Sequence, residues 1–222
     1  MPESKFNLKK KRIRSFFLSF ETSSKRDAEV EKIQNDLINV GLAYIQMKLP
    51  VDRITPELEA ELRNKAEHNI LHAKIREATE EDLESIMYLH NRAWLTANTP
   101  FRPITLDSIR AIYEYPDTAI LIARVYGTDA GFIILDFEGQ NKEFGVIAGL
   151  GIIPRFQRKG LGSVLGMAGW DYLKMQNIKE LRCEVYIENK ASYNFIKSLG
   201  FEEIETKIYK MEDFHLKDNE AL

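Results

Sequence analysis

The sequence predicts an α/β fold in which helices flank a mixed sheet. Short apolar runs bounded by turn residues alternate with stretches that repeat apolar residues at helical spacing. Two of the short runs, residues 119–125 and 130–137, follow each other closely enough to form a hairpin. From residue 73 the predicted order is β-α-α-β-β-β-α-β-α-β, which implies an α/β sheet with strands of both directions.

The composition is that of an ordinary globular protein. Its 222 residues are 44% hydrophobic and 29% charged, enough for one large domain or two small ones. The net charge of −3 argues against nucleic acid as a partner. Cys183 is the single cysteine, which excludes an intrachain disulfide and fits a reducing compartment.

Targeting signals are not evident in the sequence. No apolar run reaches the roughly 18 residues of a membrane span. The basic cluster at residues 9–14 lacks the apolar run and cleavage site of a signal peptide. We therefore expect a cytoplasmic protein without a membrane partner.

The first 72 residues are expected to form a β-α-β-α extension without a motif that carries chemistry. Strands are predicted at 12–21 and 42–49, with a helix over 23–40 between them. Thr55 before Pro56 marks the start of a second helix, expected to reach about His72. The pattern leaves open whether this extension is a small domain or packs onto the rest.

The second unit, residues 73–211, begins with a strand at 74–78 and a helix capped by Thr79. Asp82 lies three residues after Thr79, as in a capping box. A loop over 97–105 and a short helix over 106–114 follow.

The predicted hairpin turns at residues 126–129, and the next strand covers 144–153. Gly149 and Gly151 inside that strand predict a bulge or a close backbone approach. The remaining elements are helices at 163–176 and 190–199 and strands at 180–187 and 201–210, with a polar tail over 212–222.

The stretch 154–166, PRFQRKGLGSVLG, lies where a strand hands over to a helix. The first turn of a helix has unpaired N–H groups and the positive end of its dipole, which together bind phosphate. Gly160 and Gly162 let the backbone bend around such an anion, and Arg158 and Lys159 add positive charge. The stretch matches neither the P-loop nor the GxGxxG dinucleotide motif.

Two segments resemble the GCN5-related N-acetyltransferases, the GNAT superfamily. Its Gln/Arg-x-x-Gly-x-Gly/Ala signature is met by Gln157 to Gly162, after an apolar strand that ends at Pro154. Downstream, Asn189 opens NKASYNFIKSLGF, which is similar to the family's Asn-initiated helix ending in Leu-Gly-Phe. The resemblance covers residues 73–210 and implies a mostly antiparallel, twisted GNAT-type sheet.

The resemblance implies acetyl-CoA as co-substrate. Its pyrophosphate would lie on the backbone of 157–163, and its pantetheine arm would pair with the strand end at 150–153. The residues implied in cofactor binding are Ile152, Ile153, Gln157, Arg158, Lys159, Gly160, Leu161, Gly162, Ser163 and Asn189. A bulge would free the N–H groups of Ile152 and Ile153, one of which could hold the oxyanion of the tetrahedral intermediate.

The proton-transfer residues depart from the family pattern. A tyrosine proton donor is implied at position 196, which is Ile196 here. Tyr193, on nearly the same helix face, is the substitute we name as catalytic, together with Glu184 as the carboxylate. The resemblance also implies that Trp94, Phe101 and Arg102 wall the acceptor site.

Other reactive side chains have simpler interpretations. His68 and His72 have the i,i+4 spacing of zinc ligands but no evident third ligand, so no metal is expected. Cys183 falls within a predicted strand, where it is expected to be a small buried hydrophobe.

Two functional hypotheses follow. The first is an N-acetyltransferase that moves acetyl from acetyl-CoA to a small-molecule or peptide amine by direct attack. The second is a non-catalytic acyl-CoA sensor, favoured by Ile196 and by the apolar strand near Val146 and Ala148. For the first 72 residues, whose role the pattern leaves open, we consider a degenerate half of a tandem transferase or a dimerisation arm. The latter would make the protein a homodimer.

Overall fold

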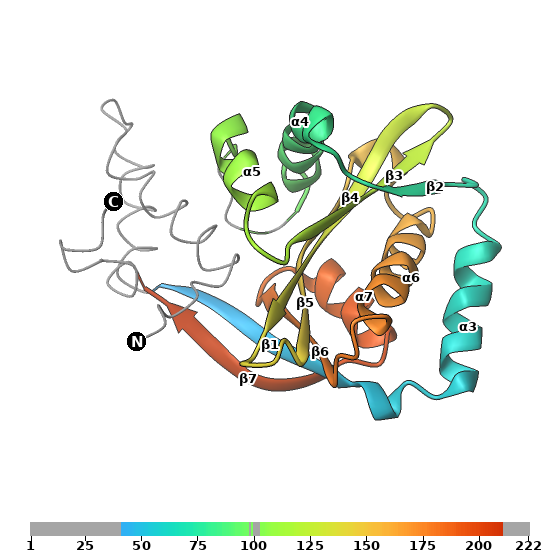
Figure 1. The fold of residues 1–222 in the computed structure, drawn as a ribbon, viewed down its shortest axis with the longest axis vertical. Coiled ribbons are helices and arrows are strands. Elements are labelled where there is room, and N and C mark those ends of the chain that lie inside the picture. The colour runs from blue at the N-terminus through green and yellow to red at the C-terminus, as the bar shows by residue number, and fades with distance from the viewer. Residues whose placement is uncertain (1–40, 98, 100–102, 211–222) are drawn as a thin grey trace.

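The computed structural model describes residues 41–97, 99 and 103–210. One seven-stranded sheet organises them, in the order β2-β3-β4-β5-β6-β1-β7 (Figure 1). Neighbouring strands are antiparallel except for β5 and β6, which are parallel. The predicted α/β fold with a mixed, mostly antiparallel sheet is confirmed.

The elements lie close to the predicted ones. The strands are β1 (Leu42–Pro50), β2 (Lys74–Glu77), β3 (Ala119–Val125), β4 (Thr128–Glu138), β5 (Phe144–Ile152), β6 (Glu180–Tyr186) and β7 (Glu202–Tyr209). The helices are α3 (Pro56–Glu67), α4 (Leu83–Trp94), α5 (Leu106–Tyr113), α6 (Leu161–Lys174) and α7 (Lys190–Ser198). The strand expected at 12–21 and the helix expected at 23–40 lie outside the described residues.

Strand β1 sits inside the sheet rather than beside it. Tyr44 pairs with Tyr186 of β6 on one side and with Lys207 of β7 on the other. Helix α3 then packs on α6 (Figure 1). The extension expected at residues 1–72 therefore contributes β1 and α3 to the same sheet and core as the residues that follow.

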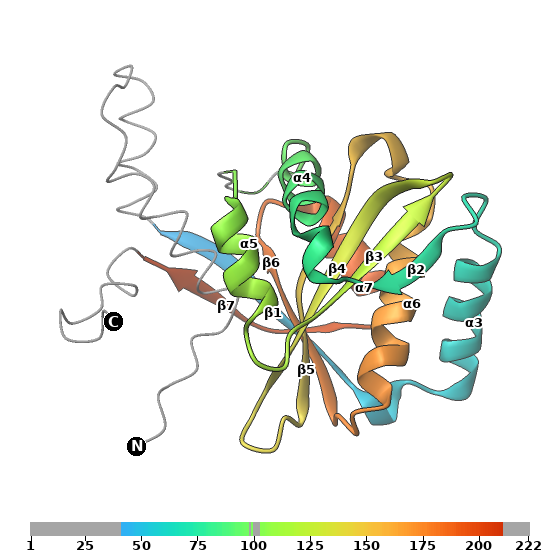
Figure 2. The ribbon, with the colours of Figure 1, turned by 45° about the horizontal axis from the view of Figure 1, so that its top comes forward.

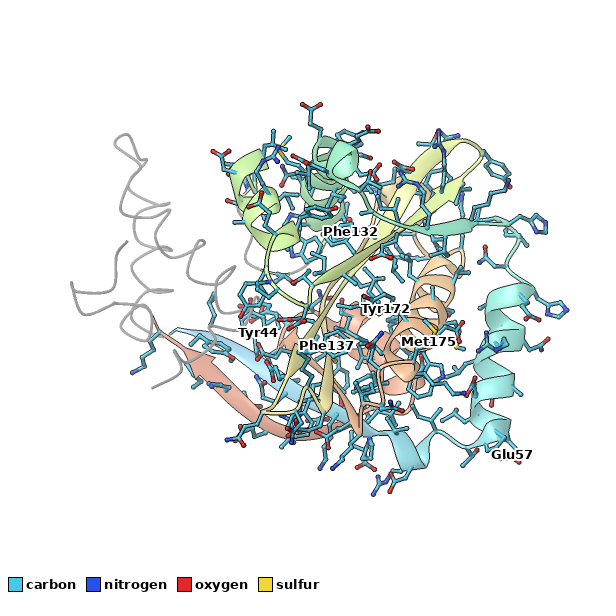
Figure 3. The ribbon with its side chains drawn as sticks, in the orientation of Figure 1. Tyr44, Glu57, Phe132, Phe137, Tyr172 and Met175 are labelled. Carbon is cyan, nitrogen blue, oxygen red and sulfur yellow. The ribbon has the colours of Figure 1, made fainter. Side chains whose placement is uncertain are left out.

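The helices cover both faces of the sheet (Figure 2). Because side chains alternate along a strand, Phe132 of β4 faces α4, where it stacks near His90, and its neighbour Ile133 faces α6, close to Gly169. In Figure 3, Tyr44 and Phe132 lie toward α4 and α5, whereas Tyr172 lies on α6. The core cluster includes side chains from both sides of the sheet.

Local signals explain most element boundaries. The capping box between Thr79 and Asp82 is present, although a short 3₁₀ turn precedes α4. The hairpin turn holds only Tyr126 and Gly127, both at positive φ, so the expected four-residue turn is wrong. Helix α3 ends at Glu67 rather than at His72, because the chain turns sharply through residues 68–72.

Candidate active site

The sheet opens between its two parallel strands. β5 and β6 are paired from Phe144–Glu180 to Ile147–Cys183 and not beyond. A cavity of about 950 Å³ lies at this opening. Its lining comes from both faces of the sheet: α4 and α5 on one, the starts of α6 and α7 on the other. The cavity therefore passes through the sheet at the gap.

A β-bulge shapes the β5 edge of the gap. The β4 register jumps from Ile134–Gly149 to Leu135–Ile147, so Ala148 is the extra residue. The bulge expected from the glycines is confirmed, and it coincides with the end of β5–β6 pairing.

The N–H groups at the end of β5 do not all point into the gap, contrary to one expectation from the sequence. The N–H of Ile153 donates to Ala130 O at 3.0 Å, so the expectation that it is free for a ligand is wrong. Along an antiparallel strand, every second residue directs its N–H and C=O groups toward the partner strand, and the residues between direct theirs away. The N–H groups of Leu150 and Ile152 therefore point away from β4 and into the gap. The carbonyl of Ile152 lies on the same edge, where it accepts from Gln157 Nε2 at 2.8 Å.

The loop before α6 has the geometry of an anion site. Arg158 and Gly160 have φ values of 58° and 81°, in the left-handed region. The helical bonds begin with Ser163 N–H to Gly160 O, at 3.0 Å. The N–H groups of Leu161 and Gly162 therefore precede the helical pattern at the positive end of the α6 dipole.

Two glycines make room for aromatic side chains at the cavity. A Cβ on Gly162 would lie 3.2 Å from Phe195 Cζ of α7. A Cβ on Gly151 would lie 2.6 Å from Phe132 Cε1 and 2.9 Å from Trp94 Cζ3. Trp94 thus packs directly on the backbone of β5 beside the gap.

The predicted cofactor residues mostly converge. Ile152, Gln157, Arg158, Gly160, Leu161, Gly162, Ser163 and Asn189 all line the cavity. Neither Ile153 nor Lys159 is part of this lining. Asn189 caps α7 by accepting from Ser192 N–H at 3.1 Å, and its Nδ2 donates to Thr99 Oγ1 at 2.9 Å.

Asn69 is a residue that sequence reasoning missed. Its side chain is buried in the turn after α3, where its Oδ1 accepts from Leu71 N–H at 2.9 Å. Its Nδ2 donates to the carbonyl of Lys159, and the absence of a side chain on Gly160 makes room for this contact. No local motif marks Asn69, because its partner lies 90 residues away in the sequence.

The two proposed catalytic residues are separated. Glu184 lines the cavity just past the last β5–β6 pair, and its Oε1 accepts from Tyr209 Oη at 2.8 Å. Burial, followed by the charge of Glu184, raises the pKa of Tyr209 well above its usual range. Tyr193 instead donates to Glu203 of β7 and is not part of the cavity lining. The side chain of Ile196 occupies the cavity wall on α7.

Of the expected acceptor-site residues, Trp94 lines the cavity. Phe101 and Arg102 lie outside the described residues. Helix α5 and the aromatic side chains of Tyr44, Tyr115 and Tyr186 also line this part of the cavity. Burial raises the pKa of Tyr186, with Glu188 as the second cause.

The remaining candidates have structural positions. Cys183 is a buried strand residue, as expected, and its strand position borders the cavity. His68 Nδ1 lies 2.9 Å from Asn64 O, at the end of α3. Within 41–97, 99 and 103–210, no cluster of three or more potential metal ligands occurs. Over the same ranges, no helix combines the length and the apolar character that crossing a bilayer requires.

A family model described as the acetyltransferase (GNAT) family matches residues 77–201, more than half of the 222-residue chain. The chain belongs to the GNAT family. An uncharacterized N-acetyltransferase of Methanocaldococcus jannaschii is 24% identical over 138 residues, or 59% of this GNAT protein and 61% of that one. The mycothiol acetyltransferase of Renibacterium salmoninarum is 36% identical over 61 residues, 28% of this chain and 18% of its own length. The chain thus spans less than two thirds of both relatives.

Solved structures show the same fold. The aminoglycoside acetyltransferase AAC(6')-Iy, bound to a CoA-acetylneamine bisubstrate analog, has a TM-score of 0.53 and 23% identity, covering 62% of this GNAT chain and 96% of its own. The PaiA N-acetyltransferase of Thermoplasma acidophilum, in complex with coenzyme A, has a TM-score of 0.52 and 21% identity, covering 62% and 99%. At sequence identities this low, the similarity to these structures shows a shared fold alone.

Proposed function

We propose that this GNAT protein is an N-acetyltransferase that moves the acetyl group of acetyl-CoA to a primary amine. One observation carries the proposal: the opening between β5 and β6 meets the start of α6 in a single cavity. A strand edge with inward N–H groups and a helix start that binds phosphate are the two features an extended acyl-CoA needs. Similar folds have been solved with CoA, which supports this choice of donor.

The cofactor would bind through backbone groups. The N–H groups of Leu161 and Gly162 would hold the pyrophosphate, with Arg158 adding charge at the rim. The pantetheine arm would lie along the free edge of β5 as an added strand. One of the two inward N–H groups, of Leu150 or Ile152, would then polarise the thioester carbonyl, which favours the tetrahedral oxyanion.

Glu184 would accept the proton that activates the amine. The ammonium gives one proton to its carboxylate, and the neutral nitrogen attacks the acetyl carbon. The C–S bond of the tetrahedral intermediate breaks, and the second proton of the nitrogen passes to the CoA thiolate. The products are the amide and CoA thiol, and the first proton leaves Glu184 for solvent. Tyr209 holds the carboxylate in place through its hydrogen bond.

A sensor that binds acyl-CoA without turnover is the second candidate. The observation that favours it is Ile196, a buried apolar side chain on the cavity wall of α7. The two candidates differ in a single measurable product, because only the enzyme releases CoA thiol when an amine is added.

The substitution Glu184→Gln tests the proposed role. We expect kcat to fall about 10²-fold or more, while the Kd for acetyl-CoA stays within about twofold. Thiol release and isothermal titration measure the two quantities. Glu203→Gln is the matched control, because Glu203 bonds Tyr193 outside the cavity, and it should keep full activity. Unchanged kcat in Glu184→Gln would refute the assignment, and binding without thiol release across many amines would favour the sensor.

A further inference from the structure

The two faces of the sheet divide the cavity into unlike halves. On the α6 and α7 side, its lining holds the cofactor loop with Arg158 and, at the start of α7, Lys190. On the α4 and α5 side, the described wall is mostly apolar and aromatic, with the hydroxyls of Thr99 and Ser108 and the carboxylate of Glu184. We name that half the acceptor chamber and define it by Tyr44, Trp94, Ile104, Ile112, Tyr115 and Glu184.

Charge in the acceptor chamber is sparse and of one sign. Among the described lining residues, the acidic side chains are Glu184 and Glu188, and the latter lies on the turn that leads to α7. Glu184 lies deep, at the end of β5–β6 pairing, with Tyr209 bonded to its Oε1. The acceptor chamber can therefore pair one ammonium group of a substrate with a carboxylate, that of Glu184.

Elsewhere in the acceptor chamber, the residues that the structure describes include no second carboxylate. Trp94 is held rigidly, because its ring stacks on His90 at 4.4 Å between centroids with 8° between the planes. Ile112 and Tyr44 are buried, and the pKa of Tyr115 is raised first by burial. The carboxylates of Asp136, Asp117 and Glu138 raise it further, but none of the three lines the cavity. A second ammonium placed against these described walls would lose its hydration without touching a carboxylate in return.

We infer that the preferred acceptor is a primary amine with one cationic nitrogen on an apolar or aromatic body. This inference rests on the proposed function and narrows it. Polycationic acceptors, such as the aminoglycosides in the name of the AAC(6')-Iy enzyme, would fit poorly. The body of the substrate would pack on Trp94 while its ammonium reaches Glu184, an arrangement that dispersion and cation–π attraction both favour.

Matched amines test this inference with the full-length protein. Hexylamine and 1,6-diaminohexane differ by one ammonium, and 2-phenylethylamine and ethylamine differ by one ring. We expect kcat/KM to be at least about tenfold higher for hexylamine and for 2-phenylethylamine than for their partners. Neamine and a polar Ser-Gly peptide should rank below both. A preference for the diamine, for neamine or for the peptide would overturn the inference.

A substitution in the cavity wall tests the same inference by changing the protein instead of the substrate. Ser108 of α5 lines the cavity, and its hydroxyl lies 2.9 Å from that of Thr105. Ser108→Asp adds a second carboxylate to the acceptor chamber and should raise the diamine-to-monoamine ratio of kcat/KM about tenfold. Gln140→Glu adds the same charge on the exposed β4–β5 turn and should leave the ratio unchanged. An unchanged ratio in Ser108→Asp would contradict the inference.

Failure of the inference and failure of the proposed function give different results. Titration of 2-phenylethylamine into the CoA-bound protein measures binding without turnover. Binding of this amine without thiol release in any reaction would refute the transferase and still support the preference of the acceptor chamber. Thiol release with polycations alone would support the transferase and refute the preference.

Discussion

A single buried amide connects the loop before α6, residues 157–160, to a part of the chain that the family match does not include. Asn69 precedes the matched residues 77–201, yet its side chain holds the carbonyl of Lys159. The same side chain accepts from Leu71 N–H, so the amide is fixed at both ends. It thereby stabilises the left-handed backbone at Gly160, which sets the direction of the next N–H groups.

The substitution Asn69→Ala should therefore weaken the binding of acetyl-CoA. We expect the Kd to rise about tenfold, the effect of losing roughly 1–2 kcal/mol of loop preorganisation, with kcat at saturation nearly unchanged. Isothermal titration and steady-state kinetics measure the two effects.

Two further variants separate the loop contact from the local turn. Asn69→Asp keeps the acceptor for Leu71 N–H and removes the donor to Lys159 O, so it should also bind weakly. Asn64→Ala, on an exposed residue of α3, should bind like the wild type. Normal affinity in Asn69→Asp would show that the turn alone matters.

At the level of elements, α3 is joined to α6 by a small network of charges. Glu59 of α3 accepts from Lys174 Nζ at 2.8 Å and from Arg63 at 3.0 Å, and Arg63 also bonds Asp171 of α6 at 2.7 Å. The hydrogen bond from Lys174 is the main reason that the pKa of Glu59 is lowered from 4.5 to about 2. The hydrogen bond from Arg63 lowers it further, whereas burial raises it. The network helps to dock α3, which carries no fully buried side chain.

This lowered pKa predicts how stability depends on pH. Because the carboxyl of Glu59 is more acidic in the folded state, its contribution is complete above pH 4.5 and is lost as the pH falls toward 2. Glu59→Gln should lower Tm by about 2–4 °C at pH 7, the size expected for about 1 kcal/mol in a protein of this length. The difference from the wild type should shrink steadily below pH 4.5. Calorimetry across this pH range measures it, and a difference independent of pH would contradict the role of the charge.

At the level of the whole molecule, β1 joins the edge strand β7 to the rest of the sheet. It pairs with β6 over seven residues, Tyr44 to Pro50, and with β7 on its other edge. Met47 and Leu42 of this strand are almost fully buried. Without β1, the β7 strand would have no partner among the described strands, because β7 is hydrogen-bonded to β1 alone.

A chain that starts at Ala73 should therefore fail to fold. We expect insoluble protein, or soluble protein without cooperative unfolding and without acetyl-CoA binding. Adding residues 41–72 as a separate peptide should restore binding in part, because it supplies β1 and α3. Solubility, circular dichroism and titration provide the measurements. A cooperatively folding fragment with normal affinity would show that β1 is dispensable.

The sequence predicted those features of the site that depend on local chemistry. The strand-to-helix junction at Gly160, the bulge beside Gly149 and the Asn189 cap each follow from a few adjacent residues. It also predicted a role for Trp94 from the resemblance, and the structure brings that ring to the β5 backbone. The separation of Tyr193 from Glu184 could not be predicted in this way, since it depends on which distant residues each side chain meets.

By itself, then, the sequence determined the α/β class, the order of the elements from residue 73 and the strand-to-helix junction at Gly160, because periodicity, capping and glycine freedom act over short distances. The tertiary structure decided three things. It placed β1 between β6 and β7, it brought Asn69 to the loop 90 residues away, and it put Glu184 in the cavity while directing Tyr193 to Glu203. The physical reason is the same in each case: strand pairing and side-chain contacts between distant residues are selected by the packing of the whole core, which no local pattern encodes.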